Sequence, residues 1–361
     1  RRQRQMCIRD RYKYGDANIG DTVEFKITMT IPDYQGSWLS DKLHYNIKDS
    51  LTDGLTLDVS SIKLEGTSIN DLFVANKKCT STSITTSTSG FTLDLYGEDV
   101  YQYAGNTIAI TYQAQVNDKA KVNFDSDENK ATLKYSTVAS GTDMSDPMQD
   151  ITHHYTFGFD TLVNGTGSEK TTEITKYGVK TTTELDNKVA LDGAQFQLFD
   201  ANGKQLYFTS AGEYTTETSG TYDYIVSKNN GQLTATGLDA GTYTLKESKA
   251  PLGYALDKTT YTIVITPTYN ELTGELKNYT VRVSGATGNS ITFTHEKLDN
   301  GTINTTDNAA NADTFGINNT PLITLPETGG AGMIVLTVAA VILMAGFGTM
   351  FVSLRKRKQV K

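Results

Sequence analysis

DTVEFKITMTI, residues 21–31, is the stretch that decides the fold class of this chain of 361 residues. Apolar and polar side chains alternate along it without a break. The apolar set is Val23, Phe25, Ile27, Met29 and Ile31, and the polar set is Glu24, Lys26, Thr28 and Thr30. Because successive side chains of a β-strand point to opposite faces, this period of two predicts a strand with one face in a core and the other in water.

The same alternation recurs in FTLDLY at 91–96 and in NTIAITYQAQV at 106–116. The low-complexity segment TSTSITTSTSG at 80–90 is interpreted as a loop or an edge strand. Short strands at this spacing, separated by polar turns, are typical of a β-sandwich. We therefore predict an all-β protein of tandem immunoglobulin-like β-sandwich domains, followed by a C-terminal transmembrane helix.

The composition supports this fold class and excludes one class of partner. Glycine is frequent (31) and proline scarce (6), and long Ala/Leu/Glu/Lys tracts are missing, which favours strands over helices. Two cysteines, Cys7 and Cys79, are too few for a disulfide framework. The formal net charge is −8, and basic clusters at both ends leave a still more acidic body, which argues against nucleic-acid binding.

Changes in composition mark the predicted domain limits. Residues 1–11, RRQRQMCIRDR, show no strand alternation and resemble translated sequencing adapter; a natural basic arm is the alternative. We expect that the true N-terminus, with any signal peptide, is missing. The segment NGTGS at 164–168 is typical of a connector, so we predict a first sandwich over 12–160, a linker at 161–171 and a second sandwich over 172–320.

The C-terminal end combines three signals in a fixed order. LPETGG stands at 325–330, within a linker predicted over 321–330. Residues 331–354 carry no charge and are long enough to cross a bilayer as a helix. The basic tail 355–361 then holds that end in the cytoplasm. The span alone would indicate an ordinary single-pass anchor.

Together these signals resemble the LPxTG cell-wall sorting signal of Gram-positive surface proteins. The positions that match are Leu325, Pro326, Glu327, Thr328 and Gly329. The resemblance implies that a sortase cleaves the Thr328–Gly329 bond and transfers Thr328 to an amine of a peptidoglycan precursor or of another pilin subunit. The chain would then be secreted and anchored to the cell wall, with the membrane as partner only before sorting.

Three polar residues stand in apolar register in the second predicted sandwich. Glu247 shares a strand face with Tyr243 and Leu245, Lys176 shares one with Ile174, and Asn319 shares one with Ile317. Burying an unpaired ionised group costs several kcal/mol, so each must be neutral, paired or solvated at the end of its strand.

The motifs around these residues resemble the B-type domains of collagen adhesin and Gram-positive pilins. They are ITKYG at 174–178, LDGAQFQLFD at 191–200, GLDAGTYTLKESKAPLGY at 237–254 and NNTPL at 318–322. The resemblance implies an autocatalytic isopeptide bond: a lysine amine attacks the Asn319 carboxamide, Glu247 polarises the carbonyl and relays protons, and ammonia leaves. Apolar burial lowers the pKa of a lysine and so favours the neutral amine. Lys176 is the favoured donor, and Lys180, which shares its parity, is the alternative.

Related features occur in the first predicted sandwich. Asp49 shares a face with Ile47, and Asn129 shares one with Ala131. With NIGDTVEFKITMTIP at 18–32, these segments resemble the pilin domain whose isopeptide bond uses an aspartate catalyst and an asparagine acceptor. Lys13 is a poor donor, so we expect that the donor lysine was lost with the N-terminus.

Two classes of function follow. The first is a structural protein, a sortase-assembled pilin subunit serving adhesion. The second is a monomeric wall-anchored adhesin that binds a host protein or glycan. A lysine motif of the VYPK type, through which pilins accept the next subunit, is not visible. No phosphate loop or nucleophile elbow is found, and adjacent strand histidines such as His153 and His154 point apart, so we predict no enzyme, no metal and no cofactor.

Overall fold

The computed structural model describes residues 13–33, 40–163, 170–179, 188–209, 216–217, 222–285, 288–308 and 314–322, without the side chains of Val74, Thr216 and Glu217. Several predicted features lie outside these residues: Lys180, the motif from Leu325 to Gly329, the span 331–354 and both terminal basic clusters. No helix among the described residues is long and apolar enough to span a membrane.

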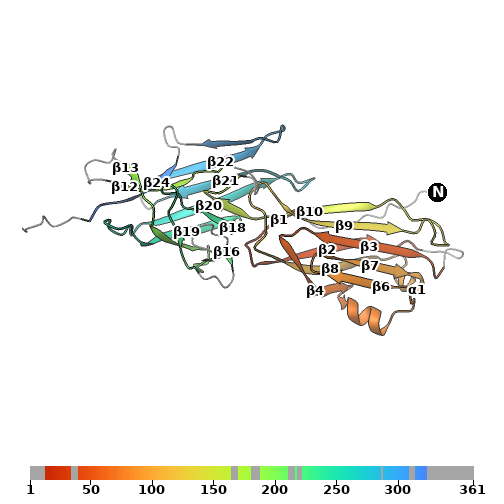
Figure 1. Cartoon of the computed structure of the whole chain (residues 1–361). Coiled ribbons are helices and arrows are strands. Elements are labelled where there is room, and N and C mark those ends of the chain that lie inside the picture. Colours follow the sequence, from red (N-terminus) through yellow and green to blue (C-terminus); the bar gives the residue numbers. More distant parts are fainter. Residues whose placement is uncertain are drawn as a thin grey trace, which may run out of the picture. The chain divides into compact units, whose positions relative to one another are not determined.

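The first sandwich consists of two sheets (Figure 1). One has the strand order β1-β10-β9-β3-β7-β6, and the other has the order β2-β8-β4-β5. The strands of the first sheet are β1 (Tyr14–Asp16), β3 (His44–Leu51), β6 (Ser83–Ser87), β7 (Gly90–Tyr96), β9 (Asp127–Tyr135) and β10 (Met148–Tyr155). Those of the second are β2 (Thr22–Thr30), β4 (Leu55–Leu64), β5 (Thr67–Ser68) and β8 (Thr107–Val116). Two short helical turns, η2 (Asp71–Ala75) and α1 (Gly97–Tyr101), follow β5 and β7.

The opening stretch of sequence forms β2, and its alternation is confirmed. Phe25, Ile27 and Met29 are buried in the core between the sheets, while Glu24 and Lys26 are exposed. The Thr-rich segment contains β6, which is an edge strand of its sheet. This agrees with a sequence that alternates too weakly to be buried on one face.

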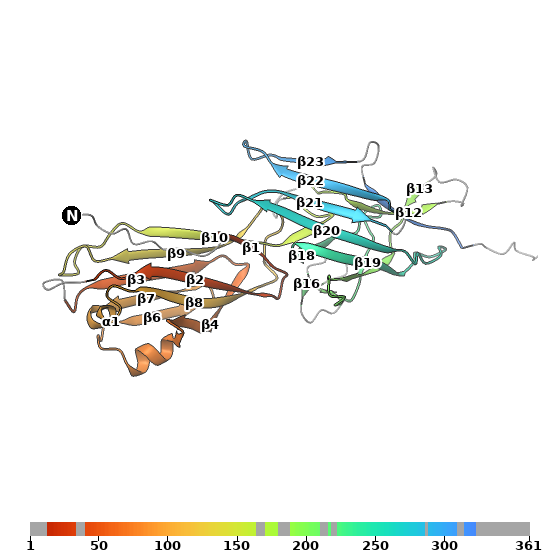
Figure 2. The ribbon, with the colours of Figure 1, turned by 180° about the vertical axis from the view of Figure 1, so that it is seen from behind.

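The second sandwich is built around a seven-stranded sheet of order β17-β14-β19-β20-β21-β22-β23 (Figure 2). Its strands are β14 (Gln195–Phe199), β17 (Ile225–Val226), β19 (Gly241–Lys249), β20 (Thr260–Tyr269), β21 (Leu276–Ser284), β22 (Ser290–Lys297) and β23 (Ile303–Asp307). A three-stranded sheet contains β13 (Lys188–Ala190), β12 (Ile174–Val179) and β24 (Phe315–Asn319) in that order. Two strand pairs complete it: β11 (Phe157–Phe159) with β18 (Ala235–Leu238), and β15 (Tyr207–Phe208) with β16 (Thr216–Glu217).

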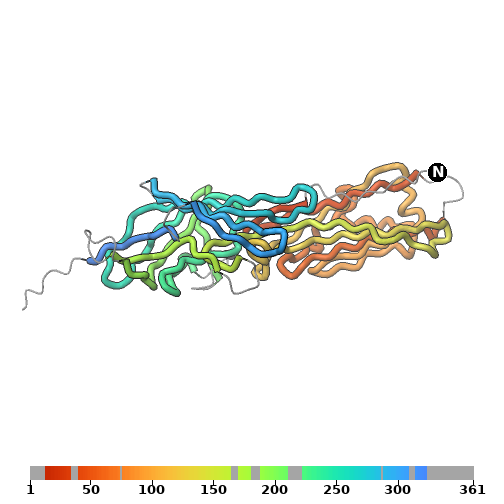
Figure 3. Tube along the Cα trace, turned by 90° about the horizontal axis from the view of Figure 1, so that it is seen from above, coloured from red at the N-terminus to blue at the C-terminus, as the bar shows by residue number. Residues whose placement is uncertain are grey.

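Each sandwich has its own hydrophobic core. Figure 3 traces the chain from the first, red to yellow, into the second, green to blue. Phe157 and Phe159 of β11 are fully buried in the second core, together with Ile174 and Ile317. The chain therefore crosses from the first core to the second close to Tyr155. The exact limits of the domains and of the linker stay predictions.

Residues before β2 also contact the second sandwich. The rings of Tyr14 and Tyr269 stack with centroids 4.1 Å apart, and the Tyr269 hydroxyl donates to Asp16 Oδ2 at 2.7 Å. The backbone N–H of Ile19 donates to the carbonyl of Gly237 at 2.9 Å. These contacts join the two sandwiches by aromatic packing and by hydrogen bonds to both backbone and side chain.

Candidate functional site

Three strands bring the candidate residues of the second sandwich together. β12 and β24 are parallel neighbours, with Lys176 opposite Ile317 and Gly178 opposite Asn319. Glu247 comes from β19 in the facing sheet. Strand parity turns all three side chains inward, so Lys176, Glu247 and Asn319 are only 0%, 6% and 1% exposed.

The three side chains meet in the core. Lys176 Nζ lies 3.4 Å from Glu247 Oε1, and Asn319 Nδ2 donates to Glu247 Oε2 at 2.9 Å. The Glu247 carboxyl group thus stands between the amine and the carboxamide. Lys176 is the donor candidate that the described residues place here, and Lys180 lies outside them.

The surroundings favour a neutral, nucleophilic lysine. Burial lowers the pKa of Lys176, although the carboxylates of Glu247 and Asp257 act in the opposite direction. Its Nζ lies 5.7 Å from the centroid of the Phe196 ring, which is itself fully buried. A desolvated amine with a lowered pKa is the form of lysine that can attack a carbonyl carbon.

Three buried atoms of this cluster make no hydrogen bond: Lys176 Nζ, Glu247 Oε1 and Asn319 Oδ1. Leaving a buried polar atom unsatisfied costs about 1–3 kcal/mol, so such atoms need an explanation. The explanation is that an amine, an acid and an amide are held next to one another in a dry core, where they can react. The arrangement can exchange the amide nitrogen of Asn319 for that of Lys176.

Sequence reasoning missed two backbone groups at this site. The carbonyl of Ala255 accepts the second N–H of Asn319 Nδ2 at 2.6 Å, and the N–H of Asp257 donates to Glu247 Oε2 at 2.6 Å. Both belong to the loop that follows the APLGY motif. Backbone groups leave no signature in side-chain identity, so no pattern in the sequence could have indicated them.

Asp49 and Asn129 also meet in the first sandwich, through a residue that the sequence did not indicate. Asn129 Nδ2 donates to the Tyr112 hydroxyl at 2.7 Å, and that hydroxyl donates to Asp49 Oδ2 at 2.5 Å. All three residues are buried. Lys13 Nζ forms an ion pair with Asp150 Oδ1. Asp150 belongs to β10 and lies opposite Ala131 of β9, the strand that pairs with β3.

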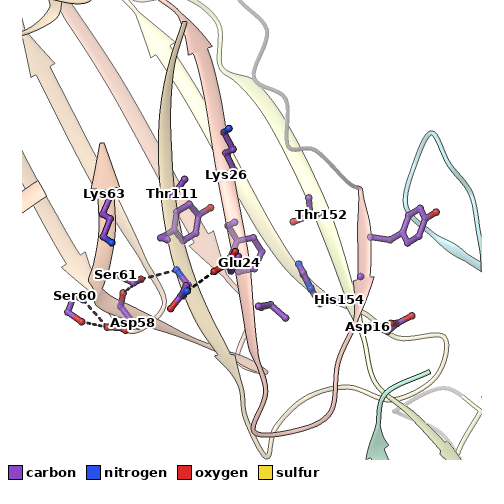
Figure 4. A pocket seen from close by; sticks show the side chains of 16 residues that line it. Asp16, Glu24, Lys26, Asp58, Ser60, Ser61, Lys63, Thr111, Thr152 and His154 are labelled. Carbon is purple, nitrogen blue, oxygen red and sulfur yellow. Dashed lines mark hydrogen bonds between the residues drawn. The ribbon is translucent and has the colours of Figure 1, made fainter. Parts of the chain in front are cut away.

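A pocket of about 810 Å³ in the first sandwich is lined by residues of β1, β2, β4, β8 and β10 (Figure 4). Lys26 and Glu24 line it from β2, and Thr152 and His154 line it from β10. Burial lowers the pKa of His154 to about 4, which keeps its ring neutral. Among the described residues, no group of three or more His, Cys, Asp or Glu side chains could hold a metal ion.

A second buried polar cluster lies at the start of β12, and the sequence did not indicate it. His295 Nε2 lies 3.0 Å from Glu173 Oε1, and Thr171 Oγ1 donates to Glu173 Oε2 at 2.8 Å. Burial and the charge of Glu173 raise the pKa of Asp160, which accepts the N–H groups of Glu173 and Ile174. These bonds join Asp160, which follows β11, to the residues at the start of β12.

Comparisons with known proteins point to Gram-positive surface proteins. Residues 174–280 match the profile of the SpaA prealbumin-like fold domain, and residues 317–361 match that of the LPXTG cell wall anchor motif. The chain is 25% identical over 292 residues to the trypsin-resistant surface T6 protein of Streptococcus pyogenes serotype M6. The match covers 78% of this chain and 46% of that protein, so the chain spans about half the length of this curated relative.

The fold is similar to that of a solved protein. The T6 backbone pilin of serotype M6 Streptococcus pyogenes, described as a modular three-domain structure, superposes with a TM-score of 0.52 at 18% identity. The superposition covers 87% of this chain and 68% of that one. At this identity the likeness concerns the fold alone.

Proposed function

We propose that this chain, a cell-wall-anchored surface protein with a SpaA-type prealbumin-like domain and an LPXTG anchor motif, is a subunit of a sortase-assembled pilus that serves adhesion. The observation that carries the proposal is the combination of the anchor motif with the buried cluster of Lys176, Glu247 and Asn319, in which Asn319 lies six residues upstream of Leu325. The similarity to the T6 protein and the fold of the T6 backbone pilin support it. We infer a structural rather than an enzymatic role.

The buried cluster would form an intramolecular isopeptide bond. The neutral amine of Lys176 attacks Cγ of Asn319 and forms a C–N bond, while the bond from Cγ to Nδ2 breaks. Glu247 carries one proton from the attacking to the leaving nitrogen, which departs as ammonia. Atoms balance without a further reactant. The 3.4 Å and 2.9 Å contacts hold the amine and the carboxamide at the same carboxyl group, which supports the proximity on which such a reaction depends.

The bond would serve a protein under tension. It would link β12 to β24, two parallel neighbours that come first and last along the chain among the strands of the three-stranded sheet. Closing a loop of about 140 residues is worth roughly 5 kcal/mol by the chain-entropy estimate. A pull on both ends of the domain would also be carried by a covalent bond and not only by the hydrogen bonds of the sheet.

Intact mass spectrometry of the ectodomain tests the bond. We expect the wild-type chain to be lighter than its sequence by one ammonia, because Lys176 loses a hydrogen and Asn319 loses its amino group. The variant Glu247→Ala, which lacks the proton carrier, should have the full sequence mass. A wild-type ectodomain at full sequence mass would contradict the proposed bond.

Asp49 and Asn129 are proposed as catalyst and acceptor of a corresponding bond in the first sandwich. Lys13 is a poor donor, because its amine is engaged by Asp150. A second ammonia missing from this chain would instead identify Lys13 as the donor, and tandem mass spectrometry of the cross-linked peptide would locate it.

Wall extracts separate the pilin from the adhesin. The predicted sortase would join Thr328 either to another pilin subunit or to a peptidoglycan precursor. In the producing bacterium, an immunoblot against this protein should show a ladder of high-mass species if it is a pilin. A single band indicates the monomeric adhesin. The variant Thr328→Ala is the control, and it should abolish either form of attachment.

A further inference from the structure

The loop 255–259 touches both partners of the Glu247–Asn319 contact. Asn319 has two N–H bonds on Nδ2: one donates to Glu247 Oε2 at 2.9 Å and the other to the Ala255 carbonyl at 2.6 Å. The N–H of Asp257 donates to the same Glu247 oxygen at 2.6 Å. One short loop thus holds the acid by a donor and the amide by an acceptor.

This contact decides which end of the Asn319 amide faces Glu247. If the amide were turned over, its oxygen would lie against the Ala255 carbonyl oxygen, and neither of these two atoms carries a hydrogen. The amino end therefore faces Glu247, and Oδ1 makes no hydrogen bond. Glu247 thus contacts the leaving nitrogen and not the carbonyl oxygen that the sequence predicted it to polarise. The orientation follows from the donors and acceptors present and does not depend on seeing hydrogens.

With this orientation, the two oxygens of Glu247 stand at the two nitrogens of the reaction. Oε1 lies 3.4 Å from the attacking amine of Lys176, and Oε2 lies 2.9 Å from the leaving nitrogen of Asn319. A proton accepted at Oε1 allows Oε2 to protonate the leaving group. A pocket of about 570 Å³ lined by residues 255–259 and 318–320 gives the ammonia a way out.

The side chain of Asp257 holds the loop in this conformation. Its Oδ1 accepts the N–H of Thr259 at 2.9 Å, and its Oδ2 accepts the hydroxyl of Tyr261. Tyr261 is anchored at the start of β20 and packs edge-on against Phe315 of β24, with ring centroids 5.8 Å apart. Asp257 thus connects the loop to the strands on both sides of the site.

We infer that Asp257 and Tyr261 are positioning residues for isopeptide formation, acting through the loop 255–259 to present the leaving nitrogen of Asn319 to Glu247. This inference rests on the proposed function. It adds to the lysine, glutamate and asparagine a fourth component, which acts by its backbone.

The test follows the rate of bond formation in the full chain. Newly synthesised protein from a short cell-free pulse is sampled over time, denatured, and scored by intact mass for loss of ammonia. Asp257→Ala and Tyr261→Phe should slow the reaction about tenfold and severalfold, respectively, since a lost hydrogen bond of about 1.4 kcal/mol corresponds to a factor of ten. Asp257→Asn keeps an acceptor oxygen and should recover most of the rate.

A matched control removes similar bonds elsewhere. Asp200 Oδ1 accepts the N–H groups of Asn202 and Lys204 at 2.9 and 2.8 Å in a turn of the same domain. Asp200→Ala should react at the wild-type rate. Asp257→Ala and Asp200→Ala are also made in a Lys176→Met chain, which cannot form the bond. In that background the two variants should have the same thermal midpoint, which separates an effect on positioning from an effect on stability.

Two results would overturn the inference. One is an Asp257→Ala chain that reacts as fast as Asp200→Ala while the wild type loses ammonia normally, which would leave the proposed function intact. The other is a loss of rate in Asp257→Ala that is fully explained by the fraction of unfolded protein measured for Asp257→Ala in the Lys176→Met background. A wild-type chain that never loses ammonia would instead remove the proposed bond itself, and this inference with it.

Discussion

Lys176 is the residue on which the chemistry depends, because it combines complete burial with the lack of a hydrogen bond at Nζ. A charged lysine at this place would need a partner, and Glu247 is the nearest carboxylate. Removing one partner of a buried pair costs about 3–5 kcal/mol when the other is left uncompensated. Without Lys176, Glu247 keeps its hydrogen bonds from the Asp257 N–H and Asn319, whereas without Glu247 the Lys176 amine has no hydrogen bond. The two ways of abolishing the bond therefore differ in stability.

We expect Lys176→Met to melt at a higher temperature than Glu247→Ala, although neither chain forms the bond. Methionine fills the space of the lysine stem among apolar neighbours such as Phe196, whereas Glu247→Ala leaves the amine buried beside a cavity. Differential scanning calorimetry of the two variants measures the difference. Equal thermal midpoints would mean that the buried Lys176 amine does not destabilise the fold in Glu247→Ala, which would contradict this prediction.

At the scale of elements, the pairing of β12 with β24 depends on glycine in ITKYG. A Cβ built on Gly178 would lie 2.5 Å from the Tyr254 ring of the APLGY motif, which is closer than real Cβ contacts allow. Gly178 stands opposite Asn319, so any shift of β12 that relieves the clash moves the acceptor relative to the donor. The glycine lets the APLGY motif close over the reaction site.

Gly178→Ala should therefore destabilise the domain by about 1–3 kcal/mol and slow isopeptide formation. Gly316→Ala on β24 is the control: its Cβ would meet the Tyr177 ring at 3.3 Å, where a small rotation of the ring suffices. Thermal midpoints and the time course of ammonia loss measure both effects. The explanation fails if the two alanine variants behave alike.

At the scale of the whole molecule, acidic groups lie where residues 13–19 meet the second sandwich. The N–H of Asp239 donates to Asn18 Oδ1 at 3.0 Å, and its side chain lies beside that of Asp16. Burial, together with the hydrogen bond and the charge of Asp16, raises the pKa of Asp239 to about 7. A carboxyl group with a raised pKa in the folded state favours folding only while it is protonated.

The sign of this effect gives a pH prediction. The contribution of Asp239 to the free energy of unfolding is fully present below its pKa of about 4 in the unfolded chain. It is lost as the pH rises through its pKa of about 7 in the folded protein. Asp239→Asn, which mimics the protonated acid, should raise the thermal midpoint relative to wild type at pH 8 and should not raise it at pH 4. Asp200→Asn should show no such pH dependence. Melting curves from pH 4 to 8.5 check both, and a constant difference for Asp239→Asn would contradict the assignment.

The sequence by itself determined the features that are local along the chain. Strand parity is set by the geometry of a single strand, so Lys176, Glu247 and Asn319 could be placed in apolar register before any partner was known. LPETGG, the apolar span and the basic tail are likewise read in order along one segment.

Only the tertiary structure decided which groups meet across strands and loops. Parity says that Asp49 and Asn129 point inward, but the Tyr112 hydroxyl that joins them comes from the opposite sheet. The Ala255 carbonyl and the Asp257 N–H are backbone groups. Every residue type has the carbonyl, and every type except proline has the N–H, so the position of these groups and not the residue identity gives them a role. Position across a sandwich depends on how two sheets pack, and that depends on the whole core at once.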